Sequence, residues 1–369
     1  MIGLAKWALA ITTVVLLFWL TLGQQSLTGT PTLESNVIES TSQQNAELQL
    51  SKGMALWENA QYQQAAQIFS SLGEKTLQPK LQSLVALYRD HSRSFLENQQ
   101  SDFFQQLPAL SESCKQKILF VTPELSSLAQ AEHFRMRFAQ DLRLKSLPIC
   151  IYATTWFDPL QINCQENWQQ SGRLGCELLS LAAKLKPLAF THLVIFADKG
   201  KANVHNGIMF LDRNDTYDVF IHELAHFSGF IDEYPLNQEL AKRVCAGVDA
   251  PNLVFQQAKQ YGTDQGYWQS LGITSEQSLY AARTCDNHST QAFKASNKLT
   301  FMEYHDTAFI PSQYLKAWQL QLQDKPNQPS AHVNFAQLYE QSNNSLESQF
   351  WRAKYQQYRA TSAHRPINL

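Results

Sequence analysis

The segment His-Glu-Leu-Ala-His at residues 222–226 constrains this chain more than any other feature. Two histidines four residues apart lie on the same face of an α-helix, with Cβ atoms about 5–6 Å apart. Both imidazoles can then reach one Zn²⁺ at about 2.0–2.1 Å. Glu223 lies beside the first histidine, where its carboxylate can take a proton from a metal-bound water. The spacing therefore predicts a helix that carries a hydrolytic zinc site.

The residues around this helix support a buried site. Residues 217–221, Tyr-Asp-Val-Phe-Ile, are apolar enough to bury the helix. Gly229 can end the helix in a left-handed turn, so that the chain folds back and presents Asp232 to the same metal. A second segment, Thr-Phe-Met-Glu-Tyr-His at 300–305, follows downstream. We therefore expect one zinc ion held by the two histidines and Asp232.

These motifs resemble a known family. The pattern His-x-x-x-His-x-x-Gly-x-x-Asp over 222–232, followed by Met302 in Phe-Met-Glu-Tyr, resembles the metzincin zinc peptidases. The run Asp-Glu-Tyr at 232–234 is also similar to the bacterial IgA-peptidase-type metallopeptidases. The resemblance is confined to about 190–235 and 298–306, and it implies a turn containing the methionine beneath the metal.

The resemblance also implies a mechanism. His222, His226 and Asp232 would bind the zinc ion and leave one position for water, whose pKa falls toward about 7. Glu223 would accept the proton of that water as it attacks a peptide carbonyl, and would return it to the leaving amine. By analogy with certain metzincins, the phenol of Tyr304 would stabilise the oxyanion.

Two departures from the family pattern leave alternatives open. Asp232 stands where histidine is commoner, so the third ligand is open between Asp232 and Glu233. Glu239 is a further alternative, since another zincin branch uses a glutamate on a following helix. Residues 237–244, however, predict a solvated amphipathic helix with Glu239 facing outward. About 75 residues separate the histidine pair from Met302, which is a long insertion for this family.

Strand and helix signals alternate through residues 113–311, which predicts an α/β (α+β) zincin-like catalytic domain with a mixed sheet and an active-site helix. The expected strands cover 117–122, 147–152, 191–197 and 207–212, and the expected helices cover 128–142 and 174–185. Residues 203–211 stand where the family places an edge strand above the cleft. Pairing of an extended substrate with that edge would supply peptide affinity.

Both flanks predict helical segments that resemble tetratricopeptide helix pairs. Residues 46–112 have apolar residues at helical spacing around a turn at 58–61, and residues 312–369 contain a second pair around 341–344. One or two units at each end are too few for a free-standing solenoid, so we expect them to pack on the middle domain. A protein partner bound through these helices is the further role that such repeats suggest.

The N-terminus predicts a targeting element. Lys6 is the only charged side chain before Glu34, and residues 7–22 are almost all apolar. This length falls between a signal-peptide core and a membrane span of about 20 residues, so residues 1–23 are expected to be a signal anchor or a signal peptide. Residues 24–45 predict a flexible linker. We expect the catalytic domain in the periplasm, anchored to the inner membrane, or secreted if the segment is cleaved.

Six cysteines fit export, because an even number can pair fully in an oxidising compartment. Cys245 and Cys285 enclose the long insertion and are one expected pair. Cys164 and Cys176 are a second. No two cysteines are spaced as Cys-x-x-Cys, which argues against a cysteine zinc site.

Composition narrows the function further. A formal net charge of −2 gives no electrostatic footprint for nucleic acid. The leading interpretation is an exported zinc-dependent metallopeptidase that acts on a peptide or protein substrate. One alternative is a catalytically weak or inactive zincin that scaffolds the envelope through its helical repeats, although an intact Glu223 argues against it. Another is a zinc amidase that acts on cell-wall material.

Overall fold

The computed structural model describes residues 33–98, 109–157, 162–256, 265–273, 279–323 and 328–360. The chain divides into two compact units, residues 1–49 and 50–369. In the first unit, the described residues form the first part of helix α2 (Leu33–Glu58).

The expected linker at 24–45 is wrong for residues 33–45, which are helical. No glycine or proline interrupts these residues, so nothing in them prevents the helix from extending toward the N-terminus. The expected targeting segment at 1–23 lies outside the described residues. Within the described part of the chain, none of the helices is both long and apolar enough to cross a membrane.

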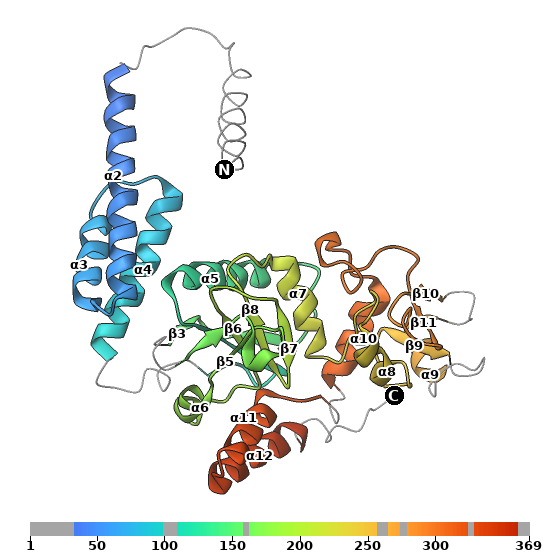
Figure 1. The fold of residues 1–369 in the computed structure, drawn as a ribbon. Helices are drawn as coiled ribbons and strands as arrows, with labels where there is room; N and C mark the ends of the chain where they lie inside the picture. The colour runs from blue at the N-terminus through green and yellow to red at the C-terminus, as the bar shows by residue number, and fades with distance from the viewer. Residues whose placement is uncertain are drawn as a thin grey trace, which may run out of the picture. The chain divides into compact units, whose positions relative to one another are not determined.

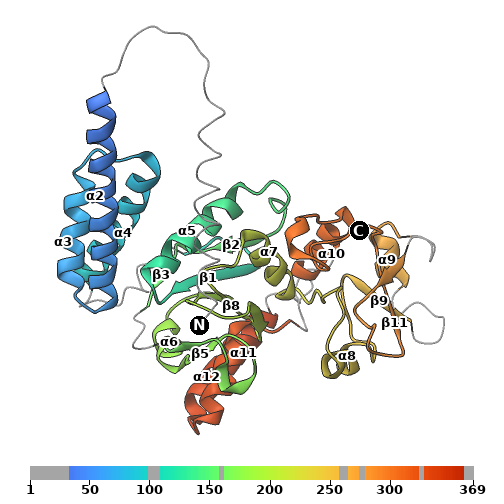
Figure 2. The same cartoon turned by 45° about the horizontal axis from the view of Figure 1, so that its top comes forward.

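A six-stranded sheet forms the centre of the second unit (Figures 1 and 2). Its strands are β1 (Gln116–Thr122), β2 (Ile149–Ile151), β3 (Thr155–Trp156), β6 (His192–Phe196), β7 (Asn203–His205) and β8 (Ile208–Leu211). The order is β2-β1-β6-β8-β7, and β3 also pairs with β1. All pairs are parallel except β7 with β8. The four expected strands correspond to β1, β2, β6 and β8, so a mixed α/β fold is confirmed.

Helices cover both faces of this sheet. They are α5 (Leu125–Gln140), α6 (Leu179–Leu185), α7 (Tyr217–His226), α10 (Ser312–Gln323), α11 (Ala331–Gln341) and α12 (Ser345–Ala360). Successive residues of a strand point to opposite faces. Ile118 and Phe120 therefore share an apolar layer with α5, α7 and α10, whereas Leu119 and Val121 share one with α6, α11 and α12. Figure 1 shows α5 and α7 above the sheet, with α6, α11 and α12 below it.

The C-terminal helix pair packs on the central domain, as expected. Phe335 of α11 and Trp351 of α12 are fully buried in the same apolar cluster as Leu193 and Ile195 of β6. The turn predicted around 341–344 separates α11 from α12. These helices therefore complete the core of the domain.

The N-terminal helices α3 (Tyr62–Gly73) and α4 (Pro79–Asn98) follow α2 after the predicted turn. Three aromatic rings of these N-terminal helices contact the ring of Trp156 in β3. Their centroids lie 5.3 Å (Trp57), 5.8 Å (Tyr62) and 4.6 Å (Phe95) from the Trp156 ring. Aromatic clusters of this kind supply large buried area, so they join the helices to the sheet.

The helix expected at 174–185 is wrong in its first part. α6 begins at Leu179, and β5 (Gly175–Cys176) pairs antiparallel with β4 (Cys164–Gln165). A single-turn helix, η2 (Trp168–Gln170), lies within the connection. The Cys164–Cys176 disulfide closes this hairpin. Residues 175 and 176 are paired in the hairpin, so the helix cannot begin until after them.

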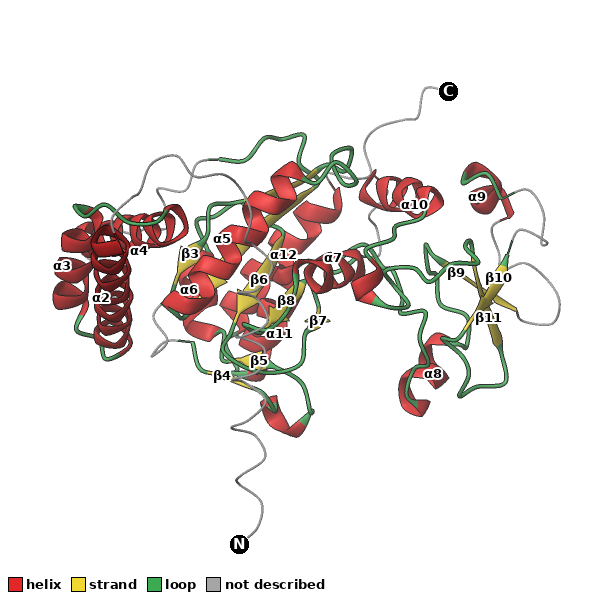
Figure 3. Cartoon of the chain, turned by 90° about the horizontal axis from the view of Figure 1, so that it is seen from above, coloured by secondary structure: helices red, strands yellow, loops and turns green. Residues whose placement is uncertain are grey.

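The insertion between α7 and residue 300 forms a second sheet. It contains α8 (Gln238–Val244), β9 (Leu253–Gln256), α9 (Gln265–Ser270), β10 (Tyr280–Ala282) and β11 (Gln291–Lys294), in the strand order β10-β11-β9. Figure 3 shows these strands as a group separate from the central sheet. The three disulfides are Cys114–Cys150, Cys164–Cys176 and Cys245–Cys285, so both expected pairs are confirmed.

An Asn-Gly turn places β7 at the edge of the central sheet. Asn206 and Gly207 have φ angles of +44° and +74°, as required for a two-residue hairpin turn that matches the twist of the strands. A Cβ atom on Gly207 would lie 2.3 Å from the backbone at Ser330 and Ala331. Only glycine fits here. Among the strands of the described residues, β8 is the one that pairs with β7, so β7 is the edge of the central sheet.

Replacing both Cys245 and Cys285 by serine should lower the free energy of unfolding by about 4 kcal/mol, because the cross-link spans 40 residues of chain. Denaturant unfolding under oxidising conditions measures this loss. The matched double variant of Cys164 and Cys176, with a separation of 12 residues, should lose about 3 kcal/mol. Wild-type stability in the Cys245/Cys285 variant would contradict the prediction.

Candidate metal centre

The start of α7 is held by side chains of neighbouring segments. The Thr216 hydroxyl accepts a hydrogen bond from the Val219 backbone at 3.3 Å, as an N-cap does. Gln130 Nε2 of α5 donates to the carbonyl oxygens of Asp212 at 3.0 Å and Asp215 at 2.9 Å. Almost every side chain of α7 is buried. The helix therefore has little freedom to rotate, and its histidines point in a fixed direction.

The end of α7 returns the chain to the same histidines. Gly229 has a φ of +82°, and its N–H donates to the His226 carbonyl at 3.1 Å. The Phe230 N–H donates to the Ala225 carbonyl at 3.3 Å. These two bonds form a Schellman-type helix end, as the glycine predicted. The reversal brings Asp232 back over the helix that carries its partners.

Backbone carbonyls fix both imidazoles. His222 Nδ1 lies 2.8 Å from the Phe301 carbonyl oxygen, and His226 Nδ1 lies 2.7 Å from the Phe230 carbonyl oxygen. A carbonyl oxygen only accepts, so each Nδ1 carries a proton and donates it. In the neutral tautomer each Nε2 then presents a lone pair. This is how metal-binding histidines are usually oriented in proteins.

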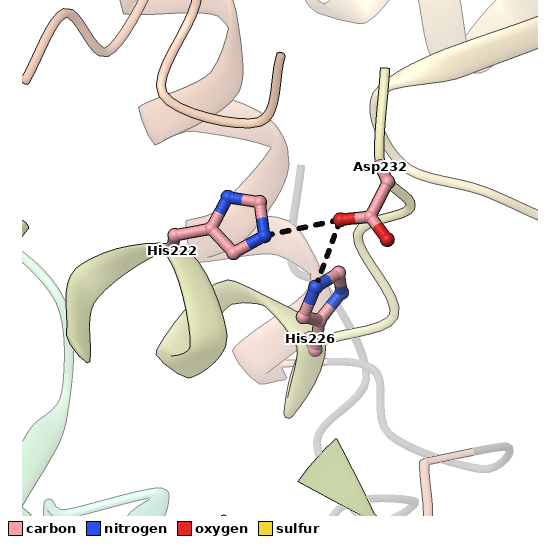
Figure 4. Close-up of side chains that lie close together, drawn as sticks. All are labelled: His222, His226 and Asp232. Atoms are coloured by element: carbon pink, nitrogen blue, oxygen red, sulfur yellow. Dashed lines mark ion pairs between the residues drawn. The ribbon is translucent and has the colours of Figure 1, made fainter. Parts of the chain in front are cut away.

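Both Nε2 atoms converge on one oxygen of Asp232 (Figure 4). His222 Nε2 lies 3.0 Å and His226 Nε2 lies 3.1 Å from Asp232 Oδ1. In the neutral tautomer neither imidazole donates a hydrogen bond to this buried oxygen. Three lone-pair atoms at one point repel one another unless a proton or a metal ion lies between them. Among the residues that the structure describes, these three form the one group of His, Cys, Asp or Glu with all ligand atoms within 4.8 Å of one another. The donor set fits zinc.

Electrostatics also favour a cation at this point. Burial lowers the pKa of His226, but the charge and the hydrogen bond of Asp232 outweigh it and raise that pKa to about 9. Burial pushes the pKa of Asp232 upward, yet the two imidazoles hold it far below its usual range. The centre therefore attracts either a proton or a metal ion. Metal binding here would release that proton.

Glu223 is buried beside the centre. Burial raises its pKa, and the charges of His226 and His222 oppose that rise. Its side chain is 8% exposed. A carboxylate whose pKa is raised is a better proton acceptor at neutral pH.

The two alternative carboxylate ligands are accounted for elsewhere. Glu233 is fully buried, and its oxygens accept hydrogen bonds from Asn252 Nδ2 at 2.9 Å, Tyr314 OH at 2.5 Å and Thr300 Oγ1 at 2.5 Å. The Glu233 carboxylate therefore makes structural hydrogen bonds to three other side chains. Glu239 lies in α8 and is exposed, as expected. Asp232 is the carboxylate that the fold brings to the histidine pair.

The turn at 300–304 lies against both ligand segments. Its Phe301 carbonyl accepts from His222, and its Met302 carbonyl accepts from the Glu233 N–H at 2.9 Å. The Met302 side chain is fully buried in the apolar layer that includes α7. The long insertion therefore does not separate this turn from the histidines in space.

Tyr304, the residue expected to stabilise the oxyanion, interacts with groups other than the three candidate ligands. Its hydroxyl interacts with Asp306, which raises the pKa of the phenol, and its ring stacks on His305 with centroids 5.4 Å apart. His305 Nδ1 also bonds to Asp306, at 2.7 Å. The His305 ring lies 6.3 Å from that of His222. Tyr304 thus interacts with two surface neighbours, His305 and Asp306.

Tyr234 is the aromatic residue that the fold brings to the centre and that the sequence did not single out as catalytic. Its ring stacks on His222, with centroids 6.4 Å apart and planes 14° apart. Burial raises the pKa of the Tyr234 phenol, and the charge of the nearby Asp232 carboxylate raises it further. The available signal was its position two residues after Asp232, since alternate residues of an extended segment point the same way.

Replacing Asp215 by asparagine should make stability less dependent on pH. Burial raises the pKa of Asp215 from 3.8 to about 7. Between pH 3.8 and about pH 7 the folded state therefore holds a proton that the unfolded state releases. The free energy of unfolding falls as pH rises through this range. The gain in melting temperature of Asp215→Asn over wild type should be larger at pH 8 than at pH 5. The exposed Asp249→Asn is the control; an equal gain at both pH values would count against the prediction.

Asp232→Ala should lose bound zinc, whereas Glu239→Ala should keep it. Removing one of three ligand atoms weakens a zinc site strongly, but the Glu239 side chain is exposed outside the centre. Metal analysis after dialysis against zinc-buffered solution measures the content of each variant. Loss of zinc in Glu239→Ala alone would refute the ligand set.

Comparison of this chain with known protein families, with characterised proteins and with solved structures finds no match.

Proposed function

We propose that this protein is an exported, metzincin-like zinc metallopeptidase that hydrolyses peptide bonds with Glu223 as general base. The convergence of His222 Nε2, His226 Nε2 and Asp232 Oδ1 on one point is the observation that supports it most strongly. A zinc ion held there would polarise a carbonyl group and lower the pKa of a water molecule.

The residues of the centre divide the remaining work. His222, His226 and Asp232 would hold the zinc ion, with one position left for water. Glu223 accepts a proton from the attacking water and then passes it to the nitrogen of the departing amine. Its raised pKa suits both steps, because a carboxylate must first gain the proton and then give it up.

The edge strand β7 supports a peptide as substrate. It is antiparallel to β8 and forms the outer strand of the central sheet. An extended peptide paired with this edge would bind through backbone hydrogen bonds, which give affinity with little side-chain selectivity. The β7–β8 hairpin precedes the candidate metal-binding helix α7 in the chain, and residues 203–211 are where the family resemblance places the strand that pairs with substrate.

Export and a further binding role form part of the same proposal. Three disulfides support an oxidising compartment. The N-terminal segment would anchor the protein to the inner membrane, or would be removed on secretion. The tetratricopeptide-like helices of both flanks would offer a surface to a protein partner.

Glu223→Gln should lower the turnover number on a peptide library by about a hundredfold to ten-thousandfold, the usual contribution of a general base. Zinc content should stay unchanged, because Glu223 is not a ligand. Glu239→Gln is the matched control and should cleave like wild type. Cleavage by Glu223→Gln at the wild-type rate would end the proposal. Activity confined to cell-wall amides would favour the amidase instead.

A further inference from the structure

Two tyrosines follow the two segments that build the centre. Tyr234 comes two residues after Asp232, and Tyr304 comes two residues after Met302. The family resemblance assigns the oxyanion to the second of them. The residues around the two phenols differ, and this difference indicates which phenol can reach the oxyanion of a substrate.

Tyr234 contacts two of the three candidate ligands. Its ring lies nearly parallel to the His222 imidazole, with centroids 6.4 Å apart, and its hydroxyl lies near the Asp232 carboxylate. The side chain is nevertheless 38% exposed. The residue is therefore held against the centre on one side and open to an incoming molecule on the other.

Tyr304 is held by different groups. Its hydroxyl is engaged with Asp306 and its ring with His305, and the side chain is 53% exposed. To serve the centre it would have to leave both partners. No such rearrangement is needed for Tyr234.

We propose that Tyr234, rather than Tyr304, is the catalytic phenol of this protein. Resting on the proposed peptidase function, its hydroxyl donates a hydrogen bond to the substrate carbonyl oxygen as negative charge develops there. Before substrate binds, Asp232 accepts that hydrogen bond and keeps the phenol oriented. When substrate binds, the same proton is shared with the substrate oxygen. No bond to hydrogen is broken, so the phenol stays neutral throughout.

The chemistry favours a donor of this kind. A donor aimed at a developing oxyanion acts mainly on the transition state, and losing one typically costs about a hundredfold to a thousandfold in turnover. A hydroxyl that only supported Asp232 would act on metal affinity instead. The two roles therefore predict different measurements.

The test compares Tyr234→Phe with the matched control Tyr304→Phe, each in the full-length, zinc-loaded protein. For Tyr234→Phe we expect the turnover number to fall about a hundredfold, with the Michaelis constant within about threefold of wild type. A phosphinic peptide, which imitates the tetrahedral intermediate, should bind about a hundredfold more weakly by calorimetry. Zinc affinity from chelator competition should change by less than about tenfold. Tyr304→Phe should match wild type in all three.

Three results would overturn the proposal. They are full turnover by Tyr234→Phe, loss of zinc from Tyr234→Phe in proportion to its loss of activity, and an equal or larger defect in Tyr304→Phe. Each of these leaves the peptidase function intact, provided that Glu223→Gln is inactive. A Glu223→Gln protein that cleaves normally would instead refute the function itself.

Discussion

Two backbone hydrogen bonds determine whether this centre exists. The Phe301 carbonyl accepts a hydrogen bond from Nδ1 of His222, and the Phe230 carbonyl accepts one from Nδ1 of His226. These bonds turn both Nε2 atoms toward Asp232. One carbonyl comes from the turn that closes α7, and the other comes from a segment 79 residues away. The helix motif supplies the ligands, but the surrounding fold supplies their orientation. A histidine pair without these carbonyls would be free to present either nitrogen.

The polar network beneath the ligand loop keeps these segments together. Glu233 links the loop to Thr300, to Tyr314 of α10 and to Asn252, and Lys294 lies 3.6 Å from its carboxylate. A buried charge is tolerated only when such partners satisfy it, and removing one of them is strongly destabilising. Burial raises the pKa of Glu233, whereas these hydrogen bonds lower it. The neighbouring Asp232 is thus held in place by a residue that is not one of the three candidate ligands.

Local patterns were sufficient for the parts of the molecule that depend on local chemistry. Apolar runs located β1, β2, β6 and β8, and the spacing of His222 and His226 with Gly229 located the centre. Two features depend on contacts that these patterns do not contain. α6 starts late because the Cys164–Cys176 hairpin occupies the preceding residues. The proposed choice of Tyr234 over Tyr304 rests on the different partners of the two phenols, Asp232 and Asp306, and no spacing rule names these partners.

X-ray absorption at the zinc edge, measured on purified full-length protein, tests the central claim most directly. We expect one zinc ion per chain, with two imidazole nitrogens at about 2.0–2.1 Å and one carboxylate oxygen at about 2.0–2.2 Å. The imidazole contribution should disappear in a variant that lacks both His222 and His226. A metal-free protein, or zinc whose environment is unchanged in that variant, would contradict the existence of this centre.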